Sequence, residues 1–72
     1  RVQLMLPLGL AYLKAGRFHE AERYLSQFIG IADPDEQDPL RIVGQLEAGF
    51  GLAEAYYGLG RREDAELWYR MV

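Results

Sequence analysis

The sequence predicts an all-α fold in which antiparallel helical hairpins, about four helices in all, stack as an α-solenoid. Apolar residues recur three and four positions apart through most of the chain, which is the period of a helix with one buried face. In addition, the segment of residues 8–22 recurs as residues 52–66 in a constant register of 44 positions. Self-similarity at a fixed period is typical of arrays in which each unit buries its apolar face on its neighbour.

The two copies agree at positions where a helical hairpin accepts few residue types. The residues that match are aliphatic, small, aromatic, turn-forming or charged, and the matching pairs are Leu8/Leu52, Ala11/Ala55, Tyr12/Tyr56, Gly16/Gly60, Arg17/Arg61, Ala21/Ala65 and Glu22/Glu66. We therefore expect one small unit of 72 residues. It would hold repeat 1 at about residues 2–32, a linker at 33–38 and repeat 2 at about 39–72.

The first helix should end at Gly16, because glycine readily adopts the left-handed conformation that closes a helix C-terminus. Its start is less clear. Pro7 lies inside the helical pattern, so the helix is either kinked there or begins near it. A second helix is expected over residues 17–32. A link of two or three residues between the two helices forces an antiparallel hairpin.

The linker of residues 33–38 contains a proline and four acidic residues. Asp38 and Pro39 suit the N-cap and the first position of a third helix. This helix should continue to about Leu59, roughly 30 Å in length at 1.5 Å of rise per residue. A fourth helix should begin near Arg62, with acidic residues in its first turn.

The third helix is unusual because it contains four glycines, Gly44, Gly49, Gly51 and Gly58. Glycine costs up to about 1 kcal/mol relative to alanine in a helix interior. Two interpretations account for this number of glycines. Either the backbone packs closely against the hairpins on both sides, or the surface is flattened to admit the backbone of a ligand.

The hairpin resembles the tetratricopeptide repeat. That family's pattern is met here by Leu8, Gly9, Tyr12, Gly16, Phe18, Ala21, Leu25 and Pro34. The spacing of 44 residues exceeds the usual 34 of the family, so the chain resembles a long-repeat variety with two repeats. It departs from the pattern at Met5 and Gly49, where a tryptophan is usual, and at Arg62, which replaces an aromatic residue.

The resemblance implies a protein-protein interaction module, with the first helix of each repeat lining a groove for a peptide or partner protein. Carried over by register, the groove candidates are Gln3, Leu6, Leu10, Leu13 and Lys14 from repeat 1, and Glu47, Phe50, Glu54 and Tyr57 from repeat 2. Such a surface would suit a peptide with apolar anchors and one basic residue. For the three leucines, packing within the unit is the alternative.

A second hypothesis is self-assembly. The last helix is still periodic at the end of the sequence, and Trp68, Tyr69 and Val72 are apolar residues that we expect to be exposed there. The unit would then stack on identical chains through its open ends, which gives either a dimer or an open polymer. Both hypotheses fit a piece of a longer array.

An enzyme is not expected, and no catalytic residue, cofactor or metal site is predicted. The chain has one serine, one histidine and no cysteine. Ser26 and His19 lie seven positions apart on one helix, about 10.5 Å of rise and outside hydrogen-bond reach. Asp33, Asp35 and Gln37 alternate as calcium ligands do, but the glycine and the glutamate that a calcium loop requires further along are missing.

The charge and hydropathy patterns exclude further classes of partner. The formal charge is −3 and the basic residues are scattered among acidic ones, which disfavours a nucleic-acid partner. No apolar stretch approaches the roughly 20 residues that span a bilayer, so no membrane association is expected. With no cysteine and no targeting segment visible, we expect a cytoplasmic protein.

Overall fold

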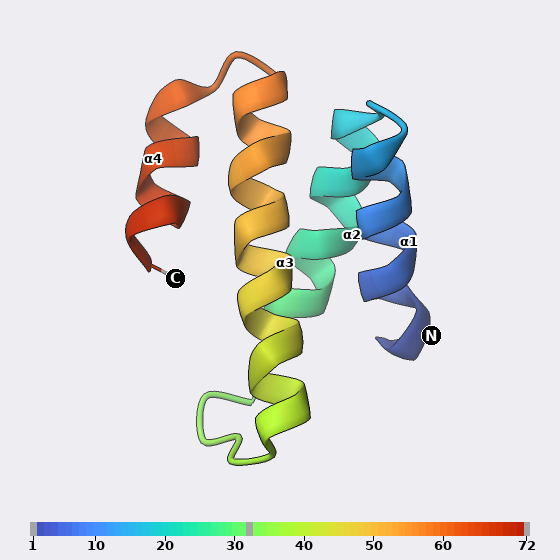
Figure 1. Cartoon of the computed structure of the whole chain (residues 1–72), viewed down its shortest axis with the longest axis vertical. Coiled ribbons are helices and arrows are strands. Elements are labelled where there is room, and N and C mark those ends of the chain that lie inside the picture. The colour runs from blue at the N-terminus through green and yellow to red at the C-terminus, as the bar shows by residue number, and fades with distance from the viewer. Residues whose placement is uncertain (1, 32, 72) are drawn as a thin grey trace.

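The computed structural model describes the backbone of residues 2–31 and 33–71, and the side chains of all these residues except 2 and 3. The described part of the chain consists of four helices: α1 (Val2–Lys14), α2 (Phe18–Gly30), α3 (Pro39–Gly58) and α4 (Arg62–Met71). Consecutive helices pack against one another in alternating direction, and α1 also packs against α3 (Figure 1). The predicted all-α fold of stacked helical hairpins is confirmed.

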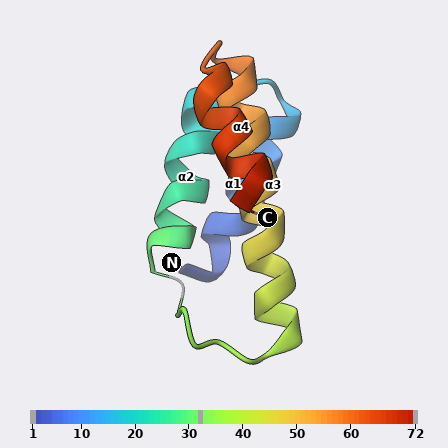
Figure 2. The same ribbon diagram turned by 90° about the vertical axis from the view of Figure 1, so that its left-hand side faces the viewer.

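The helices form two layers. Helices α1, α3 and α4 lie on the side that faces the viewer in Figure 1, and α2 lies behind them. The view turned by 90° in Figure 2 shows α2 and α3 on opposite sides of the molecule. Helix α3 is the longest and extends past the other helices at its N-terminal end (Figure 1). Among the described residues, no helix is both long and apolar enough to cross a bilayer.

The helix boundaries correct two of the expectations. Helix α1 begins at Val2 and continues through Pro7, so the alternative in which it begins near Pro7 is wrong. Pro7 is exposed, which lets its ring remain in the helix without displacing the core. Helix α2 ends at Gly30, earlier than the predicted limit. Ala32 and Val72, the last residues of the two predicted repeats, lie outside the described residues.

Both hairpins use the same turn. Gly16 and Gly60 have φ angles of 78° and 79°, in the left-handed region. In each turn the N–H of the arginine that follows the glycine donates to a tyrosine carbonyl oxygen five residues earlier, at 2.8 Å. The glycine N–H donates at 3.0 Å to the carbonyl of the residue after that tyrosine. This pair of bonds is a Schellman motif, which is why the two helices end at these glycines.

The arginines of the two turns also place their side chains over the rings of the tyrosines whose carbonyl oxygens accept from their backbone N–H groups. The guanidinium carbon of Arg17 lies 5.7 Å from the ring centroid of Tyr12, and that of Arg61 lies 4.6 Å from the ring of Tyr56. A hydrophobic contact usually accompanies the Schellman motif at these two positions. Here a cation–π contact replaces it, which explains why arginine and tyrosine recur together in both copies.

The acidic linker is held by its own hydrogen bonds. The backbone N–H groups of Asp38 and Gln37 donate to one carboxylate oxygen of Glu36 at 3.1 Å, and Arg41 donates to the other at 3.2 Å. The hydrogen bond from Asp38 contributes most to lowering the pKa of Glu36, and the bonds from Arg41 and Gln37 lower it further. Asp38 then accepts from the N–H of Leu40 at 3.0 Å and caps α3, as predicted.

The largest fully buried side chains of the core come one from α2 and one from α3. Leu25 and Leu52 are fully buried and cluster with Ala48. Fully buried alanines let the helix backbones approach closely: Ala21, Ala53, Ala55 and Ala65. Trp68, which we expected to be exposed at the end of the array, is instead half-buried against this cluster.

Two of the glycines in α3 are explained by close packing. A Cβ at Gly51 would lie 2.8 Å from a methyl carbon of Leu25, and a Cβ at Gly58 would lie 2.6 Å from three ring carbons of Phe18. Real Cβ atoms essentially never approach other heavy atoms below 3.0 Å. At these two positions the space is filled by side chains of this chain, so the interpretation of a surface flattened for a ligand is wrong there.

Tyr56 links the two hairpins through a polar contact. Its hydroxyl donates to a carboxylate oxygen of Glu22 in α2 at 3.3 Å. Burial raises the pKa of Tyr56, and the negative charge of Glu22 raises it further. The folded state therefore favours the protonated tyrosine.

This preference predicts a loss of stability at high pH. A pKa raised by folding contributes stability below the unfolded value of 10.0, and the contribution is lost as the pH rises through the folded value. Tyr56→Phe should cost about 1 kcal/mol at neutral pH through the lost hydrogen bond. Above pH 10 the difference between the two proteins should shrink, as measured by urea unfolding at a series of pH values. A difference that stays constant would contradict the assignment.

Candidate functional site

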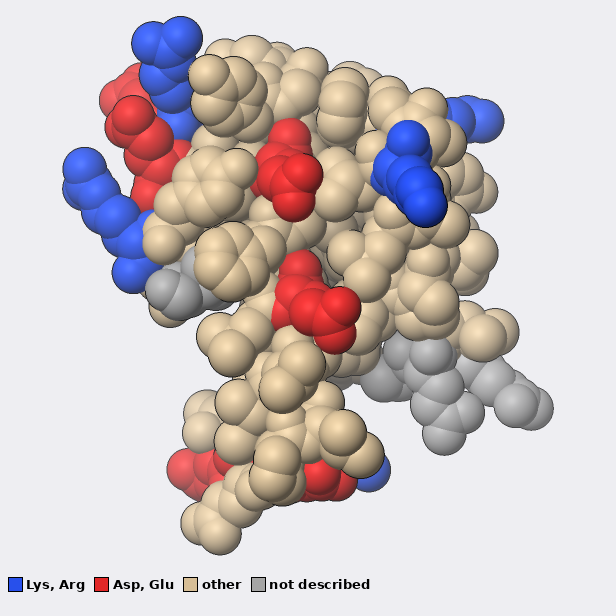
Figure 3. Space-filling view, viewed as in Figure 1, with Lys and Arg blue, Asp and Glu red and all other residues tan. Residues whose placement is uncertain are grey.

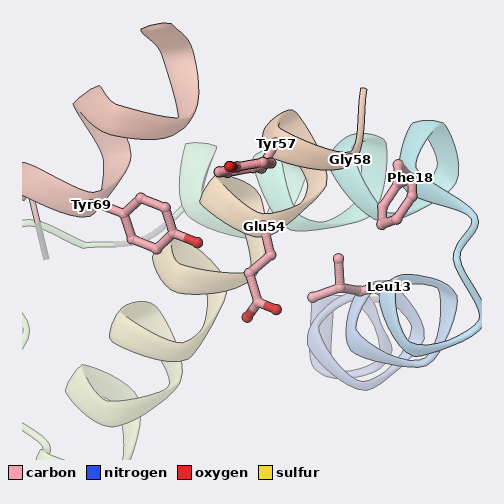
Figure 4. A pocket seen from close by; sticks show the side chains of 6 residues that line it. All are labelled: Leu13, Phe18, Glu54, Tyr57, Gly58 and Tyr69. Carbon is pink, nitrogen blue, oxygen red and sulfur yellow. The ribbon is translucent and has the colours of Figure 1, made fainter. Parts of the chain in front are cut away.

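An open pocket of about 350 Å³ lies between the two hairpins. Its lining comes from all four helices, and the residues are Leu13, Phe18, Glu54, Tyr57, Gly58 and Tyr69 (Figure 4). The side chain of Glu54 occupies the middle of the close-up view. Tyr57 lies above it and Tyr69 to its left, whereas Leu13 and Phe18 lie to its right (Figure 4). The pocket thus has a tyrosine half, formed by Tyr57 and Tyr69, and an apolar half, formed by Leu13 and Phe18, around a carboxylate.

Helical spacing places the acidic and aromatic residues of α3 on one face. Glu47, Phe50, Glu54 and Tyr57 follow one another at intervals of three and four positions, which brings them into line along a helix. All four are exposed. Tyr69 reaches this face from α4, and its ring lies 6.4 Å from that of Phe50, tilted by 52°. The aromatic surface therefore extends from the pocket along α3.

The apolar half of the pocket depends on the first hairpin. Leu13 lies near the end of α1 and Phe18 is the first residue of α2, so the glycine turn between the helices brings them together. The ring of Phe18 lies in the space that a side chain at Gly58 would fill. Gly58 thus allows the wall of the pocket to form at the point where the two hairpins meet.

The acidic residues of this face differ from those elsewhere in the chain. Between residues that the structure describes, three exposed ion pairs join an arginine to a nearby carboxylate: Arg17–Glu20, Arg41–Glu36 and Arg61–Asp64. The side-chain bond from Arg17 lowers the pKa of Glu20. Within the described part of the chain, by contrast, Glu47 and Glu54 form no side-chain hydrogen bond or ion pair. Figure 3 shows two separate acidic side chains on an otherwise largely uncharged surface over α3.

The structure places the predicted groove residues in three different environments. Leu13, Glu54 and Tyr57 line the pocket, and Glu47 and Phe50 continue the same face of α3. Leu6 and Leu10 pack against the core cluster instead. This is the alternative of packing within the unit that the sequence left open for the leucines. Lys14 is exposed at the end of α1. The side chain of Gln3 lies outside the described part of the chain.

Three of the pocket residues were not among the predicted groove residues. Tyr69 was expected at a self-association surface, but it lines the pocket together with Phe18 and Gly58. Phe18 is the aromatic residue of the repeat motif, and Gly58 is a glycine in a helix. Both features were visible in the sequence, but their contact connects different hairpins and is fixed only by the packing of α2 on α3.

The architecture and the pocket together define a helical-hairpin repeat protein with an exposed surface between its hairpins. A sequence model of the tetratricopeptide repeat family matches residues 4–40, just over half of the chain. The chain belongs to the tetratricopeptide repeat family. This family is a scaffold type rather than a catalytic one, and its members generally mediate protein interactions. No curated protein and no solved structure matched the chain.

Proposed function

We propose that this chain is a protein-interaction module that holds a peptide segment of a partner protein on the face formed by α1, α3 and α4. The observation that supports it is the pocket of exposed tyrosines beside a carboxylate. Tyr57 keeps 59% of its surface exposed and Phe50 keeps 46%. Large aromatic side chains that remain accessible are the residues that most often dominate binding energy at protein interfaces.

The organisation that we propose for the module is two repeats. Repeat 1 covers about residues 2–32, the acidic linker 33–38, and repeat 2 about 39–72. The identical Schellman turns at Gly16 and Gly60 support this division. We propose that the unit acts in the cytoplasm, because it has no cysteine that an oxidising compartment would pair.

A selection from a displayed library of random peptides tests the proposed function. The folded chain should enrich a set of related peptides, and Tyr57→Ala should weaken their binding by about tenfold or more. Leu67→Ala serves as the control, since Leu67 is also an exposed apolar residue but does not line the pocket. Enriched peptides that bind the Tyr57→Ala and Leu67→Ala variants equally well would refute the proposed face.

Self-assembly is a second candidate, favoured by a different surface. The part of α3 that extends past the other helices carries exposed apolar side chains, with Leu40 at 82%, Val43 at 51% and Leu46 at 43% exposure. Exposed apolar patches often mark interaction sites. If identical chains associate there, sedimentation equilibrium should show a mass that rises with concentration and that Val43→Lys returns to the monomer. A monomer over the whole concentration range would remove this candidate.

A further inference from the structure

We infer that the pocket selects a peptide segment with an arginine, whose guanidinium group binds Glu54 and stacks on Tyr57 and Tyr69. The inference rests on the proposed function and deepens it by naming the chemistry of the ligand. It is carried by three observations on the described residues: an acidic side chain without a partner, two accessible tyrosines beside it, and an adjoining apolar wall.

The carboxylate of Glu54 supplies the charge. It is exposed, it lies in the middle of the pocket, and no basic side chain among the described residues pairs with it. Glu47 lies seven positions earlier on the same face and adds to the negative potential there. A cationic ligand group would form charge-assisted hydrogen bonds with Glu54, which are shorter and stronger than neutral ones.

The two tyrosines favour arginine over other cations. Arginine has a planar guanidinium group that stacks on aromatic faces and can bond a carboxylate in the same plane. The chain uses this contact repeatedly in its own fold, with guanidinium carbons 4.6 to 5.7 Å from tyrosine centroids. No described arginine lies over Tyr57 or Tyr69 in this way. These rings are therefore available to a guanidinium group from a ligand.

The apolar half of the pocket indicates which residue should stand near the arginine in the ligand peptide. Leu13 and Phe18 lie on the opposite side of Glu54 from Tyr69 (Figure 4). In an extended peptide, residues two positions apart point to the same side, about 6.5 Å from each other. A ligand with an aliphatic residue two positions from the arginine would fill both halves of the pocket at once.

Two synthetic pentapeptides provide the probe. One is acetyl-Leu-Ala-Arg-Ala-Leu-amide, and the other carries citrulline, which is neutral and nearly isosteric, in place of the arginine. Titrations followed in ¹⁵N–¹H correlation spectra of the 72-residue chain should shift the amide signals of Glu54, Tyr57 and Tyr69. The arginine peptide should bind about fivefold more tightly than its citrulline counterpart, the upper range for an exposed charge pair.

Charge-removing variants separate the pocket from the general acidity of the chain. Glu54→Gln should abolish the preference for arginine over citrulline. Glu66→Gln removes a carboxylate that is also exposed but lies outside the pocket, and it should keep the preference. Equal binding of the two peptides to the unaltered chain, or the same preference in both variants, would overturn the inference.

The outcomes distinguish this inference from the proposed function. If library peptides bind and lose affinity in Tyr57→Ala but contain no required arginine, the module stands and the arginine pocket falls. If neither the library nor the pentapeptides bind, both fall together. A binding signal confined to amides in the C-terminal half of α2, away from Phe18 and the rest of the pocket lining, would also refute the pocket.

Discussion

Leu25→Ala should leave much of the chain unfolded in buffer without denaturant. Leu25 is fully buried, and its side chain reaches the backbone of α1 at Gly9 and that of α3 at Gly51. It therefore joins three helices. Truncating a buried leucine to alanine costs about 2 to 5 kcal/mol, whereas the core of a chain of this size rarely supplies more than about 3 to 5 kcal/mol.

Far-UV circular dichroism and urea unfolding measure this effect. Leu67→Ala is the matched control, because it makes the same chemical change at a side chain that is 53% exposed. It should change the free energy of unfolding by only about 0.5 kcal/mol. Should Leu25→Ala unfold at the same urea concentration as the Leu67→Ala control, α2 would not pack against both α1 and α3 as described.

The parts of the fold that depend on local chemistry were predictable from the sequence. Gly16 and Gly60 end their helices because each adopts a positive φ, and Asp38 caps the start of α3 because its carboxylate accepts a hydrogen bond from a nearby backbone N–H. Each of these signals acts within a few residues. Pro7 left two alternatives for the first helix, a kink or a later start, because the penalty of a proline is also local. The structure has the helix continue through Pro7, with α1 packed along α2.

The candidate site was predicted only in part, since helical periodicity places residues on a face but does not say which face stays exposed. The alignment of Glu54 and Tyr57 on α3 follows from spacing alone. Trp68 and Tyr69 show what spacing cannot decide. They are adjacent and both aromatic, yet Trp68 packs on the core and Tyr69 lines the pocket. The rotation of α4 that separates them depends on how its buried Ala65 packs, which is a tertiary property.

The same limit applied to α1, whose residues are apolar on nearly every side. Leu6, Leu10 and Leu13 share a helical spacing that suits either a groove or a core. Only the position of α3 decides between these, and it places Leu6 and Leu10 against the core cluster but Leu13 at the pocket. A residue whose surroundings come from a second hairpin cannot be assigned from the pattern of its own helix.

Gly9→Ala should destabilise the chain by about 1 to 3 kcal/mol, the usual cost of overpacking a tight contact. This loss of stability is opposite to the change that helix propensity alone would give, because alanine is favoured over glycine in a helix by up to about 1 kcal/mol. A Cβ at Gly9 would lie 2.6 Å from Cδ2, 2.7 Å from Cγ and 3.4 Å from the backbone nitrogen of Leu25. The methyl carbon could rotate away, but Cγ can move only if the fully buried side chain leaves its χ1 rotamer, and the backbone nitrogen only if α2 moves.

Gly30→Ala provides the comparison that isolates this contact. Gly30 ends α2 and is exposed, and a Cβ there would meet no heavy atom within 4 Å. The same substitution should therefore stabilise the chain by a few tenths of a kcal/mol to about 1 kcal/mol. Urea unfolding of the two variants should thus give midpoints on opposite sides of the parent value. If both substitutions raised the midpoint, α1 and α2 would not approach each other at Gly9, and Leu25 could not bridge the three helices as its full burial requires.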